Sequence, residues 1–478
     1  MKNNMKRFSV KIIAGILFGL LVLNACGVVT KKYERPDFSE GLVDSLYRDT
    51  TVTDTLSIGD ISWEEFFKDP KLLVLIDEAL ANNYDFQNAV LSIQAAENSL
   101  KQSKLAFLPS LDFSPSVTYN NTSQNSLNLP PSVNINLKTT NVSIGVTSSW
   151  ELEIWGKMTA AKNKAYASFM KAESGKRAYQ TSLISSVAES YFTLMALDKQ
   201  LEITLRTIDL RKETVNTLSS LLEAGTITRA DLVQAESNLY AAEIQVPELR
   251  RSIRELENAL CVLLGKPFQT IDRSKLDEVD LSRELMVGVP ARLLQNRPDV
   301  MEAEWAFREA FEQTNVAKAS FYPSITLTSG TFGISALTTR TLLDPKSIFA
   351  NIVGGLTQPL FQRGKLKANH RNALLAQQQA FNNFEKSMLV AGQEVTDALF
   401  AYKTIEEKEA IREKQIEALQ NAVTFRMKLL EFTSSTNYTD VLTSEQALLG
   451  AQIEEISDEL SKYKAMIHLY RALGGGWK

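Results

Sequence analysis

The sequence predicts a mainly α-helical fold with a small β part, and three observations lead to this prediction. Two very long segments, Lys157 to Glu223 and Lys365 to Phe432, contain no proline and keep a helical spacing of apolar residues. Stretches with alternating apolar and polar residues, the period-two pattern of a strand, precede each long segment. The same order of elements occurs twice, which predicts a duplicated unit of helix, two strands, long helix and returning helix.

The N-terminus has the pattern of an export signal. A basic stretch (residues 2–11) precedes an uncharged apolar run (residues 12–23) that is too short to span a bilayer as a helix. The next residues, LNACG, resemble a bacterial lipobox, which implies cleavage before Cys26 and attachment of diacylglycerol and an N-acyl chain to that residue. An ordinary signal peptide with an unrelated cysteine is the alternative.

Composition limits the classes of protein that fit. The 478 residues, 44% of them hydrophobic, can bury a large core, and a net charge of −4 argues against nucleic acid as a partner. The other cysteine is Cys261, so no intrachain disulfide forms unless Cys26 stays unmodified. After the signal, no apolar run is long enough for a transmembrane helix. The exported chain therefore attaches to a membrane by its lipid or crosses it as strands.

Each unit opens with a predicted helix, at residues 82–107 and 294–321, that ends near a proline. Pro109 in AFLPSLDFS and Pro323 in ASFYPSITL mark these ends, and the alternating pattern begins directly after each. The predicted strands cover residues 111–119, 142–154, 324–333 and 351–361. The last two show a weaker alternation because glycines interrupt them.

The first two strands, 111–119 and 142–154, are apolar on one face and polar on the other. Their length matches the roughly 9–11 residues of a strand that crosses a membrane in a barrel. We therefore expect a membrane β part, with a small soluble sheet as the alternative.

The helices that follow are unusually long for a globular protein, since each would extend roughly 100 Å at 1.5 Å per residue. A tight turn ends each one, and returning helices are predicted at Asp231–Leu264 and Asp440–Leu473. A returning helix and an opening helix together nearly match the length of a long helix. We therefore expect each returning helix to stack end to end on an opening helix.

This arrangement resembles the outer-membrane efflux channels of the TolC/OprM family, in particular its NodT-type lipoprotein branch. The resemblance covers residues 26–478 and depends on the lipobox, YERP at 33–36, the duplicated units, the turns in AGTITRADLVQAE and TNYTDVLTSEQALLGAQ, and the ending YRALGGGW. It implies six segments: a lipoprotein signal (1–25), a lipidated N-terminal and equatorial region (26–81), a first repeat (82–264), an equatorial linker (265–293), a second repeat (294–473) and a tail (474–478).

The resemblance also implies an assembly. Four strands cannot close a barrel, and open sheet edges are not tolerated in lipid, so several copies must combine. The family's number is three, giving a homotrimer with an α-helical barrel and a 12-stranded β-barrel, four strands per protomer. Its place would be the outer membrane, lipid-anchored and extending into the periplasm, with a periplasmic adaptor protein and an inner-membrane RND-type pump as partners.

The implied function is a passive exit duct for drugs or other small toxic compounds. Two alternatives remain: a type I secretion duct, or a periplasmic coiled-coil lipoprotein without a pore.

No arrangement of residues predicts an enzyme, and we expect no cofactor besides the lipid on Cys26. His370 and His468 lack a second metal ligand at a suitable spacing. Glu151 and Glu153 lie two residues apart, so a strand would place both on its polar face, where they predict a pore-lining charge better than an acid–base pair.

In the family, the turns at the periplasmic tips narrow the tunnel, and the matching residues here are predicted to form the gate. They are Gly225, Arg229, Asp231, Thr436, Asn437, Tyr438 and Asp440. Asp231 and Asp440 would attract cations as rings of charge, or alternatively only cap the helices that follow. The charged residues that related channels use as a latch are absent at Thr436 and Thr443, so closure is expected to depend on Tyr438 and Asn437, with Arg229.

Overall fold

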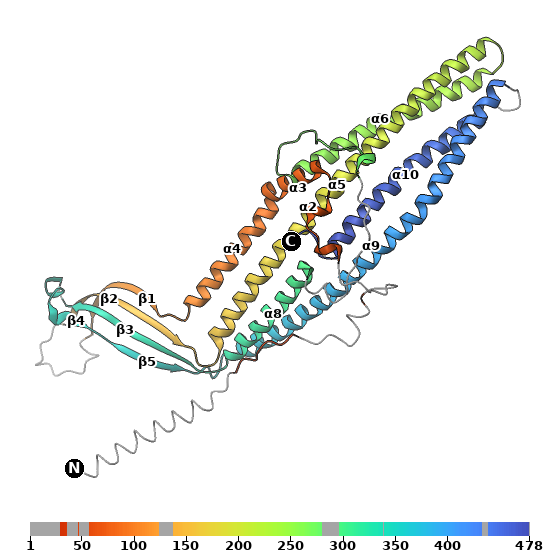
Figure 1. Cartoon of the computed structure of the whole chain (residues 1–478). Coiled ribbons are helices and arrows are strands. Elements are labelled where there is room, and N and C mark those ends of the chain that lie inside the picture. The colour runs from red at the N-terminus through yellow and green to blue at the C-terminus, as the bar shows by residue number, and fades with distance from the viewer. Residues whose placement is uncertain are drawn as a thin grey trace, which may run out of the picture. The chain divides into compact units, whose positions relative to one another are not determined.

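The computed structural model describes residues 29–35, 46, 57–123, 137–279, 296–337, 339–432 and 438–477. These residues are mainly helical and belong to two compact units (Figure 1). The first unit comprises residues 1–36, 94–170 and 304–382, and the second comprises residues 37–93, 171–303 and 383–478. Each unit therefore takes segments from both predicted repeats, and the long helices run from one unit into the other.

The first unit contains an antiparallel sheet. Its strands are β1 (Ser110–Asn121), β2 (Lys138–Leu152), β3 (Ser324–Ala336), β4 (Ile348–Phe349) and β5 (Ile352–Thr357). β2 pairs with β1 on one side and β3 on the other, and both β4 and β5 pair with β3. Because β2 comes from the first repeat and β3 from the second, the two repeats form one sheet (Figure 1).

All predicted strands are present, with different ends. β1, β2 and β3 are longer than expected at one end or both, whereas β2 stops at Leu152 and does not include Glu153. β5 ends at Thr357, two residues before Pro359, which has no N–H for a sheet hydrogen bond. The prediction of residues 351–361 as one strand was therefore too long.

Residues 29–35 lie along helix α8 (Pro298–Ala319) in the first unit. The backbone N–H of Lys31 donates to Asn315 Oδ1 (3.1 Å), and Asn315 Nδ2 donates back to the Lys31 carbonyl (2.9 Å). The Tyr33 ring meets Phe307 and Phe311 edge-on, with ring centroids 6.0 and 5.5 Å apart. The YERP stretch thus begins in an ordered segment fixed to α8.

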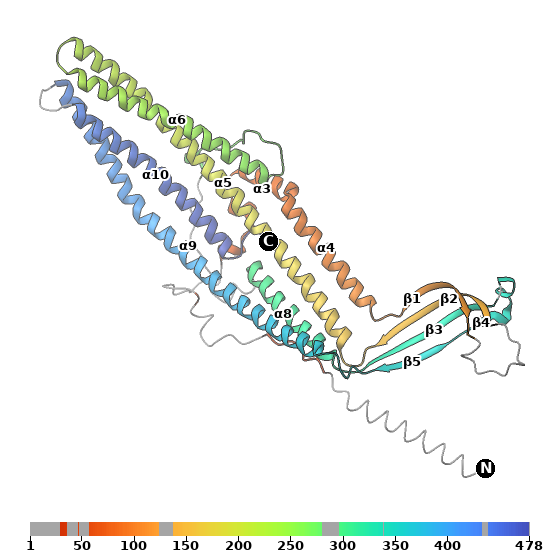
Figure 2. The same cartoon turned by 180° about the vertical axis from the view of Figure 1, so that it is seen from behind.

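The second unit is helical. Helices that belong to it wholly or in part are α2 (Trp63–Phe66), α3 (Pro70–Asn82), α4 (Tyr84–Leu105), α5 (Lys157–Glu223), α6 (Arg229–Leu263), α8, α9 (Lys365–Phe432) and α10 (Tyr438–Ala472). The predicted ends of both long helices are confirmed by α5 and α9. Figures 1 and 2 show α5 beside α6, and α9 beside α10, as two helical hairpins. No helix in the described segments has both the length and the apolar character needed to cross a membrane.

Two junctions in the second unit confirm the predicted end-to-end stacking. Asn83 Nδ2 donates to the carbonyl of Leu263 at the end of α6 (2.9 Å), and Asn83 Oδ1 accepts from the Phe86 N–H in the first turn of α4 (2.9 Å). Likewise, Arg297 Nη1 donates to the carbonyl of Ala472 at the end of α10 (3.0 Å), directly before α8 begins. At each junction, a side chain at the start of one helix therefore donates to a carbonyl at the end of the helix that stacks on it. That carbonyl has no hydrogen-bond donor within its own helix.

The main apolar core of the second unit lies where α2, α3, α5, α9 and α10 meet. The Phe66 and Tyr470 rings stack with centroids 4.1 Å apart, and the Phe192 and Tyr463 rings stack at 4.7 Å. All four rings are 8% exposed or less.

Candidate functional site: strand ends and hairpin tips

The apolar face of β1 is open to the surroundings. Leu111, Phe113 and Val117 are 70% exposed or more, and every residue of β1 is exposed. An antiparallel sheet in water normally packs one face against a core. This sheet therefore does not fit the alternative of a small soluble sheet, and its apolar face requires lipid or another protein surface.

Glu151 and Glu153 lie where β2 passes into α5, and both carboxylates are engaged. Glu151 forms an ion pair with Lys157 Nζ at 2.9 Å. Glu153 accepts hydrogen bonds from the backbone N–H groups of Met158 (2.8 Å) and Thr159 (3.3 Å) in the first turn of α5. Glu153 is thus outside the strand and acts as a helix cap, so the two residues are not a matched pair on one strand face. Their pore-lining role stays a prediction.

The first hairpin tip has a helix stop followed by a helix start. Gly225 has a φ of +71°, a left-handed conformation that favours glycine. Its N–H donates to Leu222 O, and the N–H of Thr226 donates to Leu221 O, both at 3.0 Å, which forms a Schellman motif at the end of α5. This motif turns the chain sharply toward α6.

Asp231 is the third residue of α6, which begins at Arg229 rather than at the predicted Asp231. Its carboxylate accepts from the Thr228 N–H (3.0 Å) and hydroxyl (2.7 Å), while Thr228 Oγ1 accepts from the Asp231 N–H (3.4 Å). These reciprocal bonds are a capping box. Asp231 therefore acts as a helix cap, and its role in the gate stays a prediction. Arg229 beside it is exposed.

The second tip is described only in part. Thr436 and Asn437 lie outside the described residues, as does the predicted lipidation site Cys26 far from this tip in the sequence. Tyr438 is described only as the first backbone position of α10. α10 therefore begins two residues before the predicted Asp440. Asp440 is exposed, and its backbone carbonyl accepts from Arg426 Nη1 of α9 at 2.6 Å.

The two hairpins contact each other below these turns. Val441 and Leu442 at the start of α10 are buried against Leu218 of α5 and Ala235 of α6. Of the predicted tip residues, Asp231 and Asp440 therefore lie at the same end of the second unit, in the first turns of α6 and α10 beside this small apolar cluster.

A polar cluster deeper between the hairpins was missed by sequence reasoning. Arg211 of α5 is only 6% exposed and donates through Nη1 to the carbonyl of Asn238 of α6 at 2.6 Å. Gln446 of α10 donates to Asn238 Oδ1 at 3.4 Å. Burial raises the pKa of nearby Glu445, and the Arg211 charge opposes that rise. The one signal of this cluster in the sequence is that Arg211 interrupts an apolar stripe of the long helix, between Ile208 and Val215.

Across the described ranges, no three His, Cys, Asp or Glu side chains are placed to hold a metal ion together. His370 lies against the Phe321 ring, and His468 Nδ1 is 3.7 Å from a carboxylate oxygen of Glu189.

Fold, sheet and hairpin tips together define a class of membrane export channel, and comparison with known proteins gives the family. The profile of the Outer membrane efflux protein family matches residues 75–266 and 289–475. The chain belongs to this family, which confirms the predicted TolC/OprM relationship. The first matched segment contains α4, β1, β2, α5 and α6, and the second contains α8, β3, β4, β5, α9 and α10.

Relatives of similar length are described as an outer membrane lipoprotein or as components of efflux systems. The probable outer membrane lipoprotein SilC of Salmonella typhimurium is 27% identical, over 96% of this chain and 97% of its own. The toluene efflux pump outer membrane protein TtgC of Pseudomonas putida is 28% identical, over 95% of this chain and 94% of its own. The cation efflux system protein CusC of Escherichia coli is 27% identical, over 96% and 97%.

Solved structures show the same fold. A crystal structure of CusC has a TM-score of 0.81 at 26% identity, covering 94% of this chain and 99% of CusC. The open state of the Neisseria gonorrhoeae MtrE outer membrane channel has a TM-score of 0.82 at 25% identity, covering 94% and 98%. The chain is accordingly an efflux channel protein of the outer membrane.

Proposed function

We propose that the chain forms the passive, trimeric exit duct of a tripartite efflux system, through which an inner-membrane RND-type pump expels drugs or other small toxic compounds. A periplasmic adaptor protein would dock at the hairpin tips. In this proposal the duct performs no chemistry and uses no energy itself.

The observation that carries the proposal is a sheet that is apolar on one face and open at both edges. Among the described strands, β1 pairs only with β2, and β5 pairs only with β3. Unpaired backbone groups in lipid are too costly to persist, so strands of further copies must satisfy them. If β1, β2, β3 and the shorter β5 of each copy took part, three copies would give the 12-stranded barrel that the family resemblance implies.

Apolar residues on the helices support the same assembly. Phe400, Ile411 and Phe425 on α9 are each more than 60% exposed, and Tyr240 and Ile244 on α6 are 57% and 69% exposed. Side chains of this size at helical spacing are normally covered in a coiled coil. A neighbouring copy would cover them and close the helical part of the duct.

Lipidation of Cys26 would anchor the first unit. Cys26 lies four residues before Thr30, and the side chain of Thr30 is next to Gly156 at the start of α5. The acyl chains would thus enter the membrane close to where β2 ends. Residues 26–81, which precede the first repeat, and residues 265–293, which connect the two repeats, are proposed to form the equatorial region.

The names of the relatives favour efflux over type I secretion, since TtgC and CusC are described as components of toluene and cation efflux systems. The cargo of this chain is not set by those names. A wide aqueous duct passes what its pump delivers.

Single-channel recording in planar bilayers tests the proposal. Purified full-length protein should give discrete, ohmic conductance steps, and the double variant Asp231→Ala with Asp440→Ala should raise the open fraction or reduce cation selectivity. Asp209→Ala, an exposed α5 carboxylate away from the tips, is the matched control and should change neither property. A folded, inserted protein without any conductance would contradict the duct. An unchanged open fraction together with unchanged selectivity in the double variant would leave the two carboxylates as helix caps only.

A further inference from the structure

At one end of the sheet, the strands connect to the helices of the first unit (Figure 1). Leu152 at the end of β2 pairs with Ile325 near the start of β3. Thr357 at the end of β5 pairs with Ser324, the first residue of β3. The connections from β2 to α5 and from β5 to α9 therefore begin at the same end of the sheet. A cavity of about 220 Å³ there is lined by residues of both connections and of the end of α8.

The connection from β5 to α9 changes from apolar to basic. Residues 360–371 read LFQRGKLKANHR, and the first two, Leu360 and Phe361, are 92% and 86% exposed. β5 before them exposes Ile352 (79%) and Leu356 (66%). Four exposed cations follow, which we call the basic cluster: Arg363, Lys365, Lys367 and Arg371.

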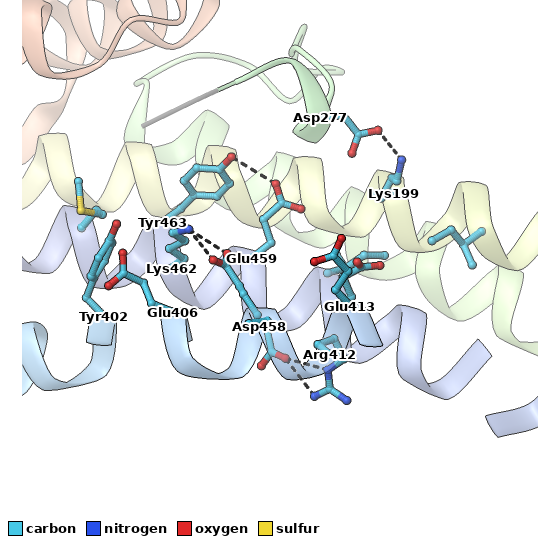
Figure 3. Close-up of a pocket in the computed structure, with 16 residues that line it drawn as sticks. Lys199, Asp277, Tyr402, Glu406, Arg412, Glu413, Asp458, Glu459, Lys462 and Tyr463 are labelled. Carbon is cyan, nitrogen blue, oxygen red and sulfur yellow. Dashed lines mark hydrogen bonds and ion pairs between the residues drawn. The ribbon is translucent and has the colours of Figure 1, made fainter. Parts of the chain in front are cut away.

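The described part of the chain does not neutralise the basic cluster. Residues 345–384 contain no Asp or Glu, and none of the four cations forms an ion pair within 4.0 Å with a described carboxylate. In the second unit, by contrast, the cations that line a cavity of about 780 Å³ are paired with carboxylates. Figure 3 shows two of these pairs, Lys199–Asp277 and Arg412–Asp458. The charges of the basic cluster are therefore available to an anion from outside the chain.

The first repeat differs at the equivalent positions. With the starts of α5 and α9 aligned, Pro359 and Phe361 take the positions of Glu151 and Glu153. In the first repeat these two carboxylates pair with Lys157 and accept hydrogen bonds from the first turn of α5. The second repeat keeps a lysine at the helix start but has neither carboxylate, so its connection is basic.

Helix stability does not explain the basic cluster. Lys365 and Lys367 lie in the first turn of α9, which contains no acidic residue. The N-terminus of a helix carries partial positive charge, so cations in the first turn are unfavourable. Arg363 has a φ of +50°, which is also unfavourable for a residue with a Cβ. Basic side chains at these positions oppose local stability, which points to an external anionic ligand.

Aromatic rings lie at the same junction. Trp155 in the β2–α5 connection and Tyr322 before β3 have ring centroids 5.2 Å apart, and both line the smaller cavity. Trp155 Nε1 donates to the Pro323 carbonyl at 2.6 Å, which fixes the indole at this junction. Tryptophan and tyrosine are enriched where a membrane meets water. The junction therefore combines the apolar, aromatic and basic side chains that suit a lipid headgroup boundary.

We propose that the basic cluster binds the phosphate groups of anionic phospholipids, while Leu360 and Phe361 lie among the acyl chains. This inference rests on the proposed function, in which the strands cross the outer membrane, and adds a lipid-binding surface to it. Lysine and arginine form charge-assisted hydrogen bonds with phosphate, and basic residues next to a membrane segment attract anionic lipids. The apolar side chains exposed on β5 and directly after it favour lipid over a soluble partner.

Quenching of a fluorescent label by brominated lipids tests this lipid-binding surface. Full-length Leu360→Cys, labelled with bimane, would be reconstituted into phosphatidylcholine vesicles that contain equal fractions of dibrominated phosphatidylcholine or dibrominated phosphatidylglycerol. Cys261 is fully buried and Cys26 is the predicted lipidation site, so the label reacts at residue 360. Both lipids should quench the label, and phosphatidylglycerol should be enriched at least about twofold over phosphatidylcholine.

Two sets of substitutions decide whether the basic cluster causes this preference. Replacing all four of its cations with Gln should remove the preference and leave quenching by brominated phosphatidylcholine unchanged, which also shows that the variant is inserted. The control replaces four exposed lysines further along α9 with Gln and should keep the preference. These are Lys386, Lys403, Lys414 and Lys428.

Salt gives a test that needs no change in the basic cluster. Between about 0.1 M and about 1 M salt, the screening length falls from about 10 Å to about 3 Å, so the preference for phosphatidylglycerol should shrink. Equal quenching by both lipids at low salt, quenching by neither, or a preference that survives the Gln substitutions or high salt would overturn the proposal. Conductance of the same preparation tests the duct separately.

Discussion

Arg297 contacts three different helices although it is only 5% exposed. Its guanidinium bonds to Asp299 near the start of α8 (3.0 and 2.6 Å), to Glu394 of α9 (2.7 Å) and to the carbonyl of Ala472 at the end of α10 (3.0 Å). Burial opposes the charge of Arg297, and the two carboxylates more than compensate, so its pKa is raised. One side chain therefore joins the two ends of the second repeat.

Arg297→Met should destabilise the protein by about 3 kcal/mol, because it leaves Asp299 and a helix-end carbonyl without their cation and Glu394 with only Arg471 at 3.5 Å. Arg251→Met is the control, since Arg251 pairs with exposed Glu248 and Glu255 on the surface of α6 and should cost under about 1 kcal/mol. Denaturant unfolding in detergent, followed by circular dichroism, measures both. Equal effects of the two substitutions would show that the buried network has no special weight.

Individual side-chain roles were the least predictable part of the molecule. The carboxylates of Glu151 and Glu153 would share a strand face only if β2 continued through Glu153. Instead β2 stops at Leu152, and Glu153 accepts hydrogen bonds from the first turn of α5. Arg211 and Gln446 are more than 200 positions apart, and only the packing of two hairpins brings both of them to Asn238. The spacing of apolar residues predicts which face of a single helix or strand is buried. It does not predict contacts between side chains of different elements.

At the scale of elements, the sequence is far more informative. α5 and α9 begin and end where predicted, because an uninterrupted helical pattern is bounded by Gly156 and Gly225 in one case and by Gly364 in the other. Helix stacking was also predictable from length alone. The strand ends were predicted less well, since hydrogen-bond partners and caps decide them.

The helix junctions give a sharp test at this scale. Gly265 follows α6 with a φ of +63°, and a Cβ there would be 2.4 Å from the carbonyl oxygen of Asn82. Gly474 follows α10 in the same way, with a φ of +84° and a Cβ position 2.4 Å from the carbonyl oxygen of Asn296. The two repeats thus use the same close approach of backbone segments.

Gly265→Ala should lower stability by more than about 1 kcal/mol, because it combines an unfavourable φ with a clash against backbone. Gly450→Ala is the opposite case, since this glycine lies inside α10 with open space at its Cβ position. There alanine should raise stability by up to about 1 kcal/mol. Thermal unfolding of both variants measures the effects, and a neutral Gly265→Ala would show that the junction tolerates displacement.

At the scale of the whole molecule, the proposed duct requires more than one copy of the chain. The sheet has two open edges among its described strands, and α6 and α9 expose large apolar side chains. These unpaired edges and exposed apolar side chains support the proposed assembly of several copies. The sequence predicted this through the strand number, but the number of copies came only from the family resemblance.

Electron microscopy of single particles is the most direct test of the proposed trimeric duct. The full-length protein would be extracted from membranes in detergent and imaged without crosslinking. The account predicts threefold particles with a detergent belt around the strand end and a continuous central channel. Its helical part should have the roughly 100 Å length that the 68 residues of α9 allow. Particles containing one copy, or lacking both the belt and the channel, would contradict it.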